Sequence, residues 1–75
     1  MNLKEQHFLR ELGSRIRRRR EELGWTQADL GERSGLHRTF IGSAERGERN
    51  LSLLNLRKIA RVLRVPLETL CVGLS

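Results

Sequence analysis

The sequence lacks the features of secreted and membrane proteins. It has a single cysteine, Cys71, so no internal disulfide is possible and nothing indicates an oxidising compartment. No run of apolar residues is long enough to act as a signal peptide or to span a bilayer. These absences favour a protein of the bacterial cytoplasm, with no membrane partner.

Proline and aromatic residues are also scarce. Pro66 is the only proline, β-branched residues are sparse, and apolar residues recur at helical spacing, which together predict an all-α fold. One tryptophan, two phenylalanines and no tyrosine leave few of the stacking surfaces that single-stranded RNA binders use. The sequence therefore argues against that class of protein.

No catalytic or metal-binding arrangement is recognisable. His7 and His37 do not stand at metal-ligand spacing from Cys71, and no glycine-rich phosphate loop follows a predicted strand. We therefore expect no enzymatic activity, no metal and no cofactor.

Positive charge is what the sequence has in excess. Fifteen Lys and Arg stand against nine Asp and Glu, a net charge of +6, and thirteen of the fifteen cations are arginine. Because arginine forms bidentate contacts with phosphate and guanine, this composition favours a nucleic-acid partner. A solvated, salt-bridged helical surface is the alternative. At 75 residues the chain is expected to be one domain with a thin stability margin.

Spacing and capping signals predict five helices, over residues 4–23, 27–33, 37–46, 53–64 and 66–72. Thr26 and Asp29 form a capping box at the second helix, and Pro66 is expected at the first helical position of the fifth. The outer face of the first helix, "SRIRRRR", is interpreted mainly as solvated. The predicted apolar face of the fourth helix is Leu53, Leu56, Ile59, Ala60 and Leu63.

Residues 27–46 have the pattern of a helix-turn-helix motif, two short helices joined by a turn at Gly35. Gly31 lies within the first of them at a cost of about 1 kcal/mol relative to alanine, so a packing reason is expected. In such motifs the second helix enters the major groove of DNA, with its N-terminal residues against base edges. The residues expected to point inward are Leu30, Leu36, Ile41 and Ala44.

The opposite face of the second motif helix has side chains suited to a DNA groove. Arg38 can pair with guanine through two hydrogen bonds, and Thr39 can contact a base or a thymine methyl group. Small residues at Gly42 and Ser43 would let the helix backbone lie deep in the groove. A plain solvent-facing helix is the alternative interpretation.

The tract "WTQADLGERSGLHRTFIGSAERGERNLSLLNLRKIARVL" resembles the helix-turn-helix family of phage Cro and repressor proteins. Within that family, "LHRTFIG" and "ERGERNLSLLNL" are most similar to the controller proteins of restriction-modification systems. The resemblance covers about residues 12–70 and implies a compact five-helix, lambda-repressor-like DNA-binding domain. The whole chain, 1–75, would form one such domain.

The resemblance also implies roles for individual residues. Arg20 and Glu45 are implied to form a buried structural pair between the first and third helices. Three departures from the controller pattern are Phe40 in place of tyrosine, and Ser34 and Arg19 at usually apolar positions. Base contacts are implied for Arg38, Thr39, Ser43 and His37. Contacts with the DNA backbone are implied for Thr26, Gln27, Arg46, Arg49 and Asn50.

The C-terminal region, about residues 65–75, is rich in apolar side chains. Family members pair through this region, so the resemblance implies a homodimer that binds two half-sites about one helical turn, ~34 Å, apart. The alternative is that these side chains close the base of the monomer, and Cys71 is interpreted as a small buried apolar residue. The candidate interface residues are Leu67, Leu70, Val72 and Leu74.

The resemblance as a whole implies a transcription regulator that binds a palindromic operator on double-stranded DNA at the nucleoid, with no small-molecule effector. As a controller protein it would regulate its own gene and that of a restriction endonuclease. The alternatives are an antitoxin-type protein-binding module of the same fold, a generic phage-type repressor, or sequence-blind binding by the arginine face.

Overall fold

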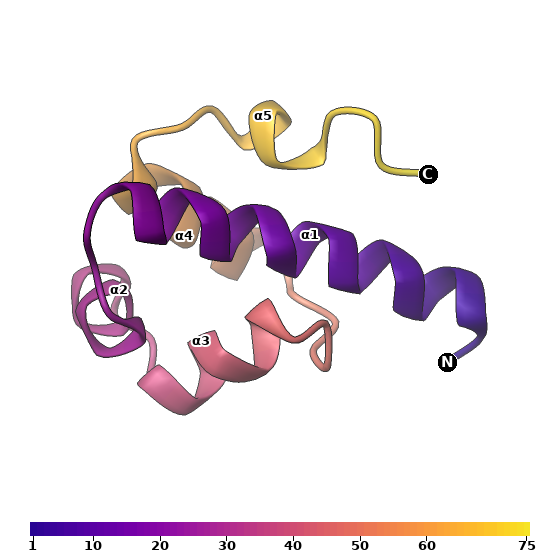
Figure 1. Cartoon of the computed structure of the whole chain (residues 1–75), viewed down its shortest axis with the longest axis horizontal. Coiled ribbons are helices and arrows are strands. Elements are labelled where there is room, and N and C mark those ends of the chain that lie inside the picture. The colour runs from indigo at the N-terminus through magenta and orange to yellow at the C-terminus, as the bar shows by residue number, and fades with distance from the viewer.

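Five α-helices enclose a small apolar core in the computed structural model, which describes all residues 1–75 (Figure 1). The all-α prediction is confirmed, and every helix end agrees with the predicted one to within one residue. Pro66 is not the first helical residue as expected, because it has an extended backbone and precedes the fifth helix as its N-cap. The helices are α1 (Leu3–Glu22), α2 (Gln27–Ser34), α3 (Arg38–Glu45), α4 (Leu53–Leu63) and α5 (Leu67–Cys71).

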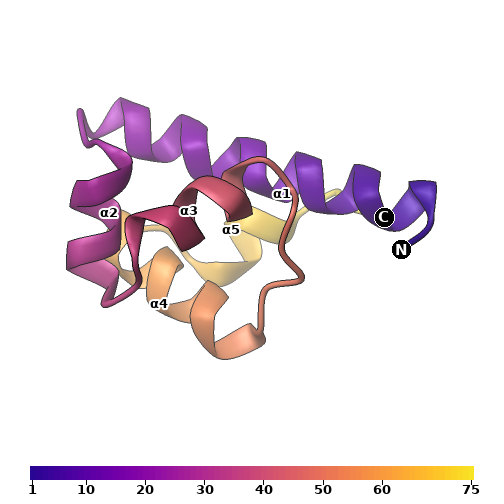
Figure 2. The same ribbon diagram turned by 90° about the horizontal axis from the view of Figure 1, so that it is seen from below.

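The long helix α1 runs between two groups of shorter helices. In Figure 1, α2 and α3 lie below it, α4 lies behind it and α5 lies above it. Figure 2, seen from below, shows α3 in front with α2 and α4 beside it. The recognition-helix candidate α3 is therefore at one face of the molecule, and α5 is on the opposite side of α1. No helix has both the length and the hydropathy that crossing a membrane requires.

Side-chain caps fix where α2 begins. The Thr26 hydroxyl accepts from the Asp29 amide at 3.0 Å, and the Asp29 carboxylate accepts from the Thr26 amide at 2.8 Å. This is the predicted capping box, and the backbone hydrogen bond from Thr26 lowers the pKa of the Asp29 carboxyl. Gly35 ends α2 with φ 76°, a left-handed conformation that glycine adopts without strain.

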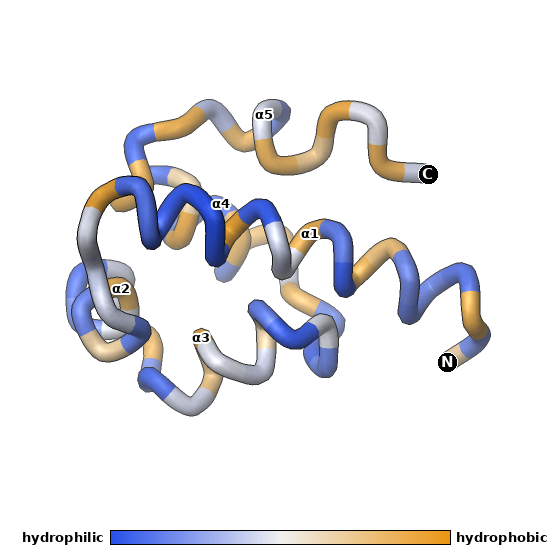
Figure 3. Tube along the Cα trace, viewed as in Figure 1, coloured by the Kyte–Doolittle hydropathy of each residue, from blue (hydrophilic) through white to orange (hydrophobic).

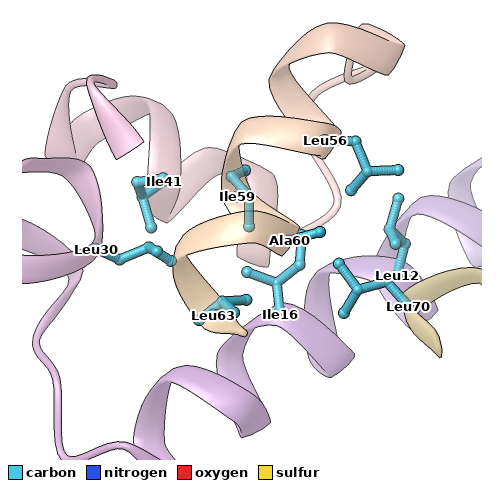
Figure 4. Close-up of a cluster of buried hydrophobic side chains, with 9 residues drawn as sticks. All are labelled: Leu12, Ile16, Leu30, Ile41, Leu56, Ile59, Ala60, Leu63 and Leu70. Atoms are coloured by element: carbon cyan, nitrogen blue, oxygen red, sulfur yellow. The ribbon is translucent and has the colours of Figure 1, made fainter. Parts of the chain in front are cut away.

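The core consists of nine buried apolar residues contributed by all five helices (Figure 4). The prediction that Leu53 belongs to it is wrong, since that side chain is 71% exposed as the first residue of α4. Ser34, a polar residue at a buried position, donates its hydroxyl to the Leu30 carbonyl at 2.7 Å and leaves no unsatisfied group. The core residues are Leu12, Ile16, Leu30, Ile41, Leu56, Ile59, Ala60, Leu63 and Leu70.

Two arginines of the strongly hydrophilic stretch of α1 (Figure 3) hold the C-terminal ends of other helices, so the prediction of a solvated face is wrong for them. Arg19 donates to the Leu63 carbonyl of α4 at 2.9 Å. Arg15 donates to the carbonyls of Leu70 and Val72 at the end of α5. These carbonyls have no partner within their own helices and lie at the negative end of the helix dipole, so a guanidinium stabilises them.

Two glycines allow close backbone contact at helix crossings. A Cβ atom at Gly13 of α1 would lie 2.3 Å from the Ala44 carbonyl oxygen of α3. A Cβ at Gly31 would lie 2.5 Å from the Leu36 carbonyl oxygen, which is the packing reason expected for a glycine inside α2. Both neighbours are backbone atoms, so a side chain could be accommodated only by moving a helix.

We predict that Gly13→Ala lowers the free energy of unfolding by at least about 2 kcal/mol, because it overpacks the crossing of α1 with α3. Urea denaturation followed by circular dichroism measures this. The matched control is Ser14→Ala, an exposed neighbour in the same helix, which should be neutral or slightly stabilising. Equal stabilities of the two variants would contradict the close contact.

Candidate nucleic-acid interface

The first turn of α3 exposes three adjacent side chains predicted to read bases. The His37 ring nitrogen Nδ1 accepts from the Thr39 amide at 3.1 Å and lies 2.8 Å from the Thr39 hydroxyl oxygen, so His37 caps the helix. Arg38 is exposed and has no hydrogen-bond or ion-pair partner within the chain. A free guanidinium at the N-terminal end of a surface helix is available for the edge of a guanine base.

Ser43, the fourth candidate for base contact, is engaged within the protein. Its hydroxyl donates to the Phe40 carbonyl at 2.9 Å and accepts from Arg49 Nε at 3.0 Å. The Arg49 guanidinium also lies 5.1 Å from the centre of the Phe40 ring. Phe40 and Ser43 thus hold Arg49, which comes from the loop after α3, against the helix. No local pattern in the sequence predicts this contact.

Gly42 is covered by two polar side chains, so its backbone is not exposed on the helix surface as the sequence had led us to expect. Its position is buried, and a Cβ there would lie 3.2 Å from both Gln27 Oε1 and Arg46 Nη1. A side chain from α2 and one from the residue that ends α3 therefore both lie close to this glycine. Its small size makes room for these two polar groups.

The residues predicted to contact the DNA backbone lie at the two ends of the motif. Thr26 and Gln27 are at the N-terminus of α2, where free amides and the helix dipole favour an anion such as phosphate. Arg46, Arg49 and Asn50 follow α3 and are all exposed. Neither their contacts with DNA nor those of the base-reading candidates are tested by the geometry of the free protein, and they stay predictions.

A buried ion pair joins α1 to α3. Arg20 Nε and Nη2 donate to the two carboxylate oxygens of Glu45 at 2.7 and 3.0 Å, and Arg20 Nη1 donates to the Trp25 carbonyl at 2.6 Å. Gln27 Nε2 donates to the same carboxylate at 3.1 Å. The hydrogen bond to Glu45 raises the pKa of Arg20, which stays charged. The pair is thus bidentate and has further hydrogen bonds on both partners.

Removing the carboxylate charge should destabilise the fold. We predict that Glu45→Gln lowers the free energy of unfolding by about 3 kcal/mol, because it leaves the Arg20 guanidinium buried without a counter-charge. Chemical denaturation measures the change. The matched control is Glu48→Gln, which removes an exposed carboxylate also paired with an arginine and should leave stability nearly unchanged. Similar losses in the two variants would contradict a special role for the buried pair.

The candidate dimer residues are not equivalent. Leu70 is only 2% exposed and belongs to the core of the single chain, so it offers no surface to a second copy. The expectation that Leu70 contributes to a dimer interface is therefore wrong, because α5 packs against α1 and α4 of the same chain. Leu67 and Leu74 are partly buried against the core, and Val72 is 68% exposed. Some of the C-terminal apolar residues thus complete the core of the single chain, and others remain on its surface.

Comparison with known proteins assigns the family. The sequence profile of the helix-turn-helix family matches residues 16–70. The chain is 46% identical over 52 residues to the control protein C.SmaI of Serratia marcescens, covering 69% of this chain and 62% of that protein. The chain thus spans somewhat less than two thirds of that relative.

Solved structures of similar proteins have the same fold. The restriction-modification controller protein C.AhdI of Aeromonas hydrophila superposes with a TM-score of 0.81 at 40% identity, covering 83% of this chain and 94% of that one. The biofilm regulator SinR, solved in complex with DNA, superposes with a TM-score of 0.76 at 34% identity, covering 80% and 97%. The fold is thus that of lambda-type repressor domains. The chain belongs to the helix-turn-helix family of DNA-binding transcription regulators.

Proposed function

We propose that this protein is a controller protein of a restriction-modification system. It binds a two-fold-symmetric operator as a homodimer and regulates its own gene and the endonuclease gene at the bacterial nucleoid. Two similar proteins, C.SmaI and C.AhdI, are named as controllers of this kind, which supports the proposal. The matching tract includes the whole motif from α2 to the loop after α3.

The observation that carries the proposal is the free guanidinium of Arg38. Among the arginines near the motif, Arg20, Arg46 and Arg49 have hydrogen-bond partners within the chain, and Arg33 lies 4.2 Å from the Trp25 ring centre. Arg38 has none and is at the exposed N-terminal turn of α3. That position and chemistry suit direct reading of a guanine in the major groove.

The proposed dimer uses the exposed part of the C-terminal region. Val72 is exposed, and Leu67 and Leu74 are partly so, which gives α5 and the residues after it an apolar surface across α1 from α3. A two-fold axis there leaves both α3 helices free. Each α3 would then read one half-site, about one helical turn from the other.

Selection of bound duplexes from a random DNA pool tests the proposal. It is carried out at about 0.15 M salt, because purely electrostatic binding falls steeply with salt. We expect enrichment of a two-fold-symmetric sequence with half-sites about 10 base pairs apart. Retention of DNA with no enriched sequence would indicate sequence-blind binding, and negligible retention would point to a protein partner; either result contradicts the proposal.

A pair of substitutions separates base reading from backbone contact. We predict that Arg38→Ala weakens binding to the selected operator by about 1–3 kcal/mol and relaxes the preference at one base pair per half-site. Gln27→Ala should instead weaken binding to all duplexes alike, because phosphate contacts do not depend on sequence. Titration of matched and singly mismatched duplexes measures both effects. An unchanged preference in the Arg38 variant would reassign that residue to phosphate.

A further inference from the structure

The loop after α3 contains an acidic residue among the cations predicted to lie along the DNA backbone. The Glu48 carboxylate accepts from Arg46 Nε at 3.1 Å. Both side chains are more than half exposed, at 59% and 57%. Arg49 and Asn50 follow directly, so Glu48 is the one acidic residue in the segment 46–50. As an anion it would repel a phosphate group, if this loop contacts the DNA backbone as proposed.

Arg46 is placed by one hydrogen bond and lies close to Gly42. Its Nη1 atom is 3.2 Å from the Cβ position that Gly42 leaves empty, beside Gln27 Oε1, and its Nε atom donates to Glu48. The guanidinium therefore lies back along α3 toward the start of α2, with a carboxylate on its Nε edge. That edge is one of those with which arginine binds the two oxygens of a phosphate group.

We propose that Glu48 competes internally with DNA phosphate for Arg46 and so limits the affinity of the protein for every duplex. This inference rests on the proposed function in one respect, that Arg46 contacts the DNA backbone. When DNA binds, the Arg46 guanidinium exchanges the carboxylate for a phosphate oxygen, and the displaced Glu48 charge stays near the duplex. The exchange costs affinity without affecting the base contacts of Arg38.

The competitor is present under ordinary conditions. The hydrogen bond from Arg46 lowers the pKa of the Glu48 carboxyl, so the group is ionised at neutral pH. The same hydrogen bond raises the pKa of Arg46. Neither charge is therefore lost by titration near neutral pH, and the competition depends on salt and on DNA concentration.

A double-mutant cycle tests this mechanism. Binding of wild type, Glu48→Gln, Arg46→Gln and the double variant is measured on a random-sequence duplex and on the selected operator, by fluorescence anisotropy at about 0.05 to 0.3 M salt. The matched control is Glu68→Gln, which changes the net charge equally. Because α5 belongs to the proposed dimer surface, all variants are compared at protein concentrations at which sedimentation shows each of them to be dimeric. Glu68 is exposed in the first turn of α5, across α1 from α3.

We expect Glu48→Gln to tighten binding to both duplexes by the same factor, about three- to twentyfold for a dimer at low salt, and Glu68→Gln to change it much less. The salt dependence should steepen by roughly one released counterion per subunit. In the Arg46→Gln background, Glu48→Gln should tighten binding no more than Glu68→Gln does.

Two results would overturn the inference. Equal effects of Glu48→Gln and Glu68→Gln would mean that only net charge matters. An undiminished gain in the Arg46→Gln background would mean that Glu48 repels DNA directly and not through Arg46. If wild type enriches no operator sequence, the proposed function fails, while the cycle on the random duplex still decides whether Glu48 competes for Arg46.

Discussion

The bidentate pair between Arg20 and Glu45 is the contact on which the geometry of the DNA-binding face depends. The carboxylate at the end of α3 accepts from α1 through Arg20 and from α2 through Gln27. Arg20 also holds the Trp25 carbonyl, one residue before the cap of α2. One buried carboxylate thus fixes three helices relative to one another, and its charge is compensated by hydrogen bonds from both sides.

This constraint explains how so short a helix can present its first turn to a partner. α3 has only eight residues, too few for an isolated helix to be stable, so tertiary contacts must hold it. Glu45 secures its C-terminal end, Ile41 is fully buried in its middle, and Gly13 lets α1 approach its backbone. The N-terminal turn can remain exposed because the rest of the helix is fixed.

Local signals in the sequence predicted most of the fold. The capping box of α2 and the turn at Gly35 both depend on residues within a few positions of one another. Other features depend on how the helices pack against one another, which the spacing of apolar residues along the sequence cannot specify. These are the exposure of Leu53, the burial of Leu70 and the two side chains that cover Gly42. The contacts within the candidate site, such as that of Arg49 with Ser43, were for the same reason not predictable from the sequence.

The arginines show most clearly why composition overstates the charge available to DNA. Three arginines of α1 form hydrogen bonds within the protein and so stabilise the fold. Arg15 and Arg19 donate to backbone carbonyls, and Arg20 donates to Glu45. Arg46 is paired with Glu48, and Arg49 is held by Ser43 and Phe40. Near the motif this leaves Arg38, at the N-terminal end of α3, without a hydrogen-bond or ion-pair partner. The proposed mode of DNA binding would therefore depend on base contact more than the net charge of +6 suggests.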